Sequence, residues 1–189
     1  MRRMVMVAVT VLAILVGMGV ASAEPIDNPV YAQWAKFKAG SFVRYAQKSV
    51  AMNNETTSEV EYKLLEVTPE KVVVEMSTSM TVAGNKVNVP PTRMEHLAKV
   101  EIRGSLATTT VAGAGSGSSK QAVEEFVLGD KKLKCNVMET NVDQAGSKVT
   151  SKIWHSDDVP GSLVKSETKL EGPMSSVTSI TLVDVKADR

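Results

Sequence analysis

The sequence predicts a mainly β protein of the α+β class. We expect an antiparallel, strongly curved sheet or half-barrel of about eight to nine strands with one short N-terminal helix. From Ser41 onward, apolar and polar residues alternate with a period of two, which is typical of strands with one face in water. Gly, Asn and Pro residues interrupt this alternation at the spacing of turns. Before Ser41, residues 29–38 follow helical spacing.

The first residues have the features of a secretory signal peptide. Arg2 and Arg3 precede an apolar run from Met4 to Val20, and Ala21-Ser22-Ala23 is a small-x-small cleavage pattern. The apolar run is shorter than the roughly 20 residues of a membrane-spanning helix. We therefore expect cleavage of residues 1–23, no membrane span afterwards, and export to the periplasm or outside the cell.

Residues 24–189 are expected to form a single β-rich exported domain. Cleavage would remove two of the 22 basic residues and none of the 21 acidic ones, so the exported chain would carry a net charge of −1. A nearly neutral domain with mixed charges offers no electrostatic attraction for nucleic acid or an anionic membrane. Cys135 is the only cysteine, so no disulfide can form within the chain.

A short helix is predicted over residues 29–38. Asp27 or Asn28 can cap it, Pro29 suits its first turn, and Gly40 suits its end. Within it, Val30, Trp34 and Phe37 form an apolar stripe.

The best candidates for a ligand-binding face come from two strands with alternating apolar and polar residues. In "SEVEYKLLEV" and "KVVVEMSTSMTV" one face is apolar and the other polar. The ligand face would contain five residues, which are Tyr62, Leu64, Val74, Met76 and Met80. Methionines are adaptable linings for apolar ligands, although the same residues could equally be core beneath the helix.

The middle of the chain is less regular. Pro90-Pro91 cannot lie within a central strand, and a strand or a short helical turn is expected near 93–102. The Gly/Ser-rich segment at about 107–119 predicts a mobile loop. Asn54 begins an Asn-x-Thr sequon, which would matter only in an organism that glycosylates exported proteins.

No motif points to catalysis, a cofactor or a metal. Gly113, Gly115 and Gly117 are not followed by the third glycine of a dinucleotide fingerprint or by a P-loop lysine. The possible metal ligands show no tight ligand spacing; they are His96, Cys135, His155, Asp157 and Asp158. Cys135 shares a strand face with Leu133 and Val137, so it should be a buried and unreactive thiol.

The stretch "KIWHSDDVPGS" predicts a strand that ends in a corner. Alternation places Ile153 and His155 on one face and Trp154 on the other, over apolar surface or lysine stems. Pro160 and Gly161 then supply the turn geometry. We interpret Trp154, Pro160 and Gly161 as a structural corner motif rather than a catalytic cluster.

The order of these features resembles a group of exported bacterial proteins. "GSFVRY" opens the sheet, and "WHSDDVPGSLVKSE" places a tryptophan at a strand end before a proline corner and a Val-Lys strand. In this the chain looks like LolA/LolB-like half-barrel proteins and related uncharacterised domains. The resemblance implies a half-barrel fold whose concave face carries lipoproteins or acyl chains, and it assigns no residue by position.

The sequence thus leaves three functional hypotheses. The first is an exported, non-enzymatic binding or carrier module that holds an apolar ligand, or a lipoprotein or peptide segment, on the concave sheet face. The alternative is a structural or assembly protein of the cell envelope without a ligand, whose partner would be an envelope protein. An enzyme is the third and least supported hypothesis. The oligomeric state is not predicted.

Overall fold

The structure, a computed structural model, describes residues 25–52, 54–82, 85–100, 116–144, 146–172 and 175–189. The expected signal segment at 1–23 lies outside these residues. The elements in chain order are β1 (Ile26–Asp27), α1 (Pro29–Trp34), β2 (Phe42–Ala51), β3 (Asn54–Val67), β4 (Lys71–Val82), β5 (Asn85–Leu97), β6 (Lys99–Val100), β7 (Ser116–Leu128), β8 (Lys131–Gln144), β9 (Ser147–His155), β10 (Leu163–Glu171) and β11 (Ser176–Lys186).

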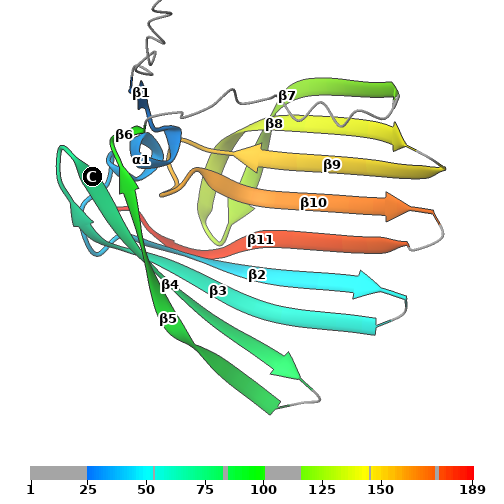
Figure 1. Cartoon of the computed structure of the whole chain (residues 1–189), viewed down its shortest axis with the longest axis horizontal. Helices are drawn as coiled ribbons and strands as arrows, with labels where there is room; N and C mark the ends of the chain where they lie inside the picture. The colour runs from blue at the N-terminus through cyan, green and yellow to red at the C-terminus, as the bar shows by residue number, and fades with distance from the viewer. Residues whose placement is uncertain (1–24, 53, 83–84, 101–115, 145, 173–174) are drawn as a thin grey trace, which may run out of the picture.

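Nine of the strands form one antiparallel sheet, in the order β5-β4-β3-β2-β11-β10-β9-β8-β7 (Figure 1). All but one of the neighbouring pairs are consecutive along the chain. The exception is the central pair of β2 and β11, which joins the first and last strands of the sheet. The strand number and the antiparallel arrangement therefore agree with the sequence prediction.

The expected strong curvature is wrong. The sheet is open and is neither strongly curled nor closed, since its edge strands β5 and β7 are not paired with each other (Figure 1). One reason lies in β5, which contains Pro90 and Pro91 and breaks its register with β4 between Met76 and Thr78. Proline lacks the N–H group that a further ladder would need, so β5 remains an edge.

The helix is shorter than predicted. Asn28 caps it by accepting a hydrogen bond from the Val30 N–H at 3.0 Å, as expected, but the last helical residue is Trp34. A turn follows in which the Phe37 N–H donates to the Trp34 carbonyl, and Gly40 adopts a φ of +93°. The Tyr31 hydroxyl donates to the Thr68 carbonyl at 2.9 Å and thereby ties α1 to the β3–β4 turn. This helix, the only one among the described residues, is too short to cross a membrane.

The register divides the sheet into two unlike faces, because residues directly opposite each other in an antiparallel ladder share a face. We call the face that contains Tyr45 the uncharged face. From β5 through β9 it has no Asp, Glu, Lys or Arg among the described residues. On β8 and β7 the face contains every second residue, and these residues remain uncharged from Asn136 to Val142 and from Gly117 to Val123. We call the opposite side the charged face.

The core is concentrated at one end of the sheet, where α1 and the 156–162 corner pack. On the central strands and β4 nearly all the buried residues belong to the uncharged face, and they include Val43, Tyr45, Leu64, Val74 and Leu182; Val73 on the charged face is the exception. On β8 and β9 they belong to the charged face instead, and they include Leu133, Cys135, Val137 and Trp154.

The covered face therefore changes across the sheet. Two features accompany the change. Sheet twist accumulates at roughly 20–25° per strand. The end of the β7–β8 hairpin also approaches β11, where Lys131 Nζ donates to the Val185 carbonyl at 3.4 Å.

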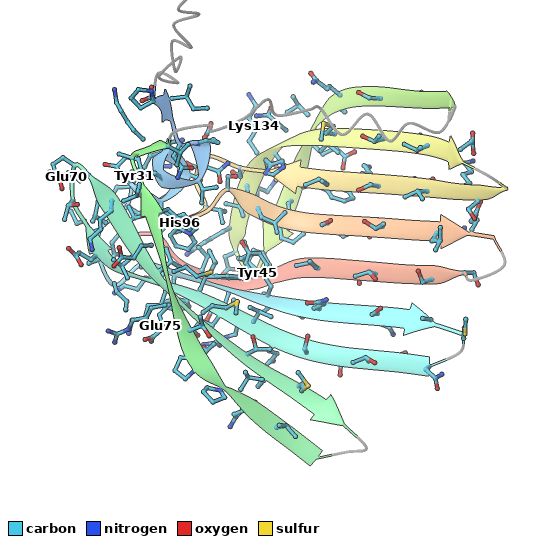
Figure 2. The ribbon with its side chains drawn as sticks, in the orientation of Figure 1. Tyr31, Tyr45, Glu70, Glu75, His96 and Lys134 are labelled. Atoms are coloured by element: carbon cyan, nitrogen blue, oxygen red, sulfur yellow. The ribbon has the colours of Figure 1, made fainter. Side chains whose placement is uncertain are left out.

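The other half of the sheet is a single layer. Figure 2 shows side chains crowded around the helix end and sparse along the free ends of the strands. None of the described residues in 46–60, 138–153 or 165–181 is buried. This half, which we call the free half, leaves both sheet faces accessible.

Candidate functional site: an uncovered, uncharged sheet face

All five residues predicted to line a ligand face do lie on the uncharged face. Tyr62 is opposite Met76, Leu64 is opposite Val74, and Met80 is opposite Ser58. Leu64 and Val74 are only 0% and 1% exposed, so they belong to the core. Tyr62, Met76 and Met80 are partly exposed, and they lie where the covered end gives way to the free half.

The free half of the uncharged face is built from aliphatic and hydroxyl side chains. Near its two edges lie four exposed apolar residues, which are Val87, Val89, Val123 and Met138. Between them runs a row of seven hydroxyl residues, one on each strand from β7 to β3, consisting of Ser119, Thr140, Ser151, Thr168, Thr178, Ser49 and Thr56. Some members bond to each other; Ser49 Oγ and Thr178 Oγ1 are 3.2 Å apart.

A shallow hollow opens on this face near β7 and β8. It has a volume of about 360 Å³ and is lined by residues that include Gln121, Val123, Met138 and His155. A second hollow of about 270 Å³ shares Asn136 and His155 with it and reaches Gln33 and the 156–162 corner. His155 Nδ1 lies 3.2 Å from Ser162 Oγ. The pair of hollows thus combines an apolar floor with polar groups at one end.

The charged face neutralises its own charges. Arg44 bonds to Glu61 at 2.8 Å and lies 3.5 Å from Asp184, and the bond to Glu61 raises the pKa of the guanidinium. Lys48 pairs with Glu55, and similar pairs extend along β10. A hollow of about 500 Å³ is lined by charged residues of this face, which are Arg44, Glu59, Glu61 and Lys86, and by uncharged neighbours such as Ser77 and Ser79. Because these pairs are exposed, each contributes little to stability, but each places opposite charges side by side on this face.

Two lysine ammonium groups lie over the Trp154 ring, where the sequence predicts apolar surface or lysine stems. Trp154 is only 6% exposed, and Lys152 Nζ and Lys165 Nζ lie 4.6 Å and 4.8 Å from the ring centroid. Its hydrogen-bond partner is not indicated by the local sequence: Trp154 Nε1 donates to Glu124 Oε2 at 2.7 Å, and Lys152 Nζ bonds to the other carboxylate oxygen. Glu124 is 30 residues away along the chain, and only the order β7-β8-β9 could have indicated it.

The corner itself is a packing and charge junction. Gly161 adopts a φ of +74°, and a Cβ atom added there would lie 3.0 Å from the Trp34 ring. Asp157 pairs with Lys36 at 2.6 Å, and Asp158 pairs with Arg189 at 2.7 Å. The bond from Lys36 lowers the pKa of Asp157. The corner thus joins α1 to the C-terminus.

The candidate metal ligands are not brought together. Among the described residues, no three His, Cys, Asp or Glu side chains could hold one ion. Cys135 is buried with Leu133 and Val137, as predicted, and burial raises the pKa of its thiol. Residues 107–115 of the predicted Gly/Ser loop lie outside the described residues. Residues 116–119 belong to strand β7, which begins at Ser116.

Glu124 should make stability depend on acid. The bonds from Lys152 and Trp154 lower its pKa, so its contribution is present above the ordinary value of about 4.3 and is lost as the pH falls through the lower folded value. Glu124→Gln should therefore have a lower urea midpoint than the wild type at pH 7, and the difference should shrink below pH 4. A difference between the variant and the wild type that stayed the same at pH 7 and below pH 4 would contradict this assignment.

Comparisons with known proteins place only distant structures beside this one. No family model matches the chain, and no curated protein does. A crystal structure of a candidate lipoprotein from Parabacteroides distasonis aligns with a TM-score of 0.42 and 11% identity, covering 82% of this chain and 98% of that one. A DUF1329 family protein from Desulfovibrio piger aligns with a TM-score of 0.27 and 11% identity, covering 80% and 87%. Neither is described as LolA- or LolB-like, and likenesses at this level assign no function to the chain.

Proposed function

We propose that the protein is an exported, non-enzymatic binding module that holds an uncharged, apolar ligand on the free half of the uncharged face. The supporting observation is the separation of charge. The sheet carries its ion pairs on one side, whereas the other side has no Asp, Glu, Lys or Arg from β5 to β9 among the described residues and exposes mainly aliphatic, hydroxyl and amide groups. Exposed apolar surface of this kind often marks a binding site.

The chemistry of the face narrows the ligand class. Burial of an ionic headgroup on the uncharged face would leave its charge without a partner, and that is costly. An acyl chain, or an apolar lipoprotein or peptide segment, loses no such interaction. The hollow beside Val123 and Met138 offers a starting point for such a chain, with Asn136 and His155 available to a polar end group. This is the use of the sheet that the LolA/LolB resemblance suggests.

Binding of the uncharged dye N-phenylnaphthylamine, displaced by a monoacylglycerol, tests this proposal. Met138→Glu places a charge beside the hollow at a residue that is 40% exposed, and it should weaken dye binding about tenfold or more. Val177→Glu makes the same kind of change at a residue 46% exposed on the charged face, opposite Lys169, and should leave the affinity nearly unchanged.

Two outcomes would contradict the proposal. If the wild-type chain bound neither compound, the alternative of an envelope scaffold without a ligand would be favoured. If both variants lost binding equally, the ligand would not occupy the uncharged face. Unfolding curves for both variants are needed first, and the exposure of both residues predicts folded proteins.

A further inference from the structure

The two edges of the sheet differ in their protection against pairing with another strand. On β5, Pro90 and Pro91 lack N–H groups, the register shifts, and Lys86 and Arg93 lie exposed. These are devices by which proteins block edge-to-edge association. The other edge strand, β7, has no proline and pairs with β8 over thirteen residues without a register shift.

The edge strand β7 also carries exposed apolar side chains. No described strand pairs with its outer side. Val123 and Val127 are both 61% exposed, more than the exposed valines of β5, and they lie on the same face of β7. An uninterrupted run of backbone donors and acceptors beside exposed valines favours the addition of a strand.

We propose that the strand added to β7 is the β7 strand of a second copy of this chain. The copies would be related by a two-fold axis perpendicular to the sheet. This axis would pass midway between the Ala122 residues of the two copies. In this antiparallel register, residues whose numbers add to 244 are opposite each other. Lys120 of each copy then faces the partner's Glu124, and Gln121 faces the partner's Val123.

Charge selects this register over its neighbours. A two-fold axis perpendicular to the sheet keeps the charged faces of the two copies on the same side. The nearest alternative registers therefore place the axis between the two Gln121 residues or between the two Val123 residues. The first places Glu124 opposite the partner's Ser118, and the second places Lys120 opposite the partner's Phe126. Only the register through Ala122 gives two oppositely charged cross-strand pairs on the charged face. Glu124 already bonds to Lys152 and Trp154, but a carboxylate can accept further hydrogen bonds.

The pairing would be symmetric and closed, as in most homodimers. It would also join the uncharged faces of the two copies into one continuous surface. The proposal stands apart from ligand binding, because it concerns the sheet edge and can be tested without a ligand.

Position-specific cross-linking tests the register of the β7–β7 pairing. The protein used is the chain as it is purified from the producing cell. Two Ala122 residues at the axis would have Cα atoms about 4.5–5.5 Å apart, within the range of a disulfide. Ala122→Cys should give a covalent dimer with oxidised glutathione. Ser118→Cys is exposed on the same face, but its two copies would lie about 27 Å apart at about 3.4 Å per residue, so it should remain monomeric on a non-reducing gel. The native Cys135 is buried and should not contribute.

Charge reversal tests the edge independently. The wild type should sediment as a concentration-dependent dimer, and Lys120→Glu should sediment as a monomer because it places two carboxylates opposite each other on both sides of the axis. Lys86→Glu makes the same change on β5 and should remain dimeric. A wild-type monomer would overturn the proposal and would point to another occupant of the β7 edge. Equal cross-linking at positions 118 and 122, or loss of the dimer only in Lys86→Glu, would overturn it as well.

Discussion

Val74→Asp should leave the chain unfolded at 25 °C. Val74 is buried on β4 between Leu64 and Met94 of the neighbouring strands, at the covered end of the sheet. A carboxylate there would have neither water nor a cation beside it, and burial of an unpaired charge costs several kcal/mol. A single domain is typically stable by only about 5–15 kcal/mol, so this one change can remove most of its stability. Circular dichroism should show loss of the β signal, and the urea transition should disappear.

A change on the same strand provides the control. Thr81→Asp lies on the charged face of the free half, exposed, with Thr57 and Lys86 directly opposite. It should alter stability by less than about 0.5 kcal/mol, as surface substitutions usually do. If Thr81→Asp were the damaging change, the assignment of the two faces would be inverted.

Gly161→Ala should destabilise the protein by about 2–5 kcal/mol. The left-handed backbone at this position costs a residue with a Cβ about 1–2 kcal/mol. The added methyl group would also meet the Trp34 ring at 3.0–3.2 Å, and overpacking of this kind costs about 1–3 kcal/mol. The urea midpoint should fall accordingly.

Two further variants separate strain from crowding. Gly146→Ala has a similar φ of +80° with no atom near the added Cβ, so it should show the backbone cost alone. Trp34→Leu removes the ring atoms that face Gly161, so Gly161→Ala should cost less in that background. If the two effects simply added, Trp34 and Gly161 would not be in contact and the packing of the corner would differ from that described.

The sequence was informative about local structure because strand alternation and turn residues are local signals. They predicted the strands, the two faces of β3 and β4, the burial of Cys135 and the side of Trp154. The length of α1 was overestimated because residues 35–38 continue the helical spacing although the chain turns after Trp34. The curvature was wrong because it depends on register shifts, such as the one between Leu64 and Glu66, that no local pattern indicates.

The candidate site was predicted only in part, for a related reason. Alternation assigns a residue to a face, but it does not indicate how far the covering layer extends along the strand. Leu64 and Met80 have the same position in the pattern, yet the helix end seals the first and leaves the second partly exposed. The change of the covered face at β8 depends on the position of the β7–β8 hairpin near β11, a contact between residues 54 positions apart.

The single-layered half of the sheet has a consequence for how unfolding is measured. Residues there bury little apolar area when the chain folds, because no second layer covers them. The heat capacity of unfolding and the urea m-value both scale with the surface that unfolding exposes. Both should therefore be lower than is usual for a chain of this length. Backbone amides of 46–51 and 166–171 should exchange with deuterium through local opening, whereas those near Val43 and Leu182 should exchange only when the whole molecule unfolds.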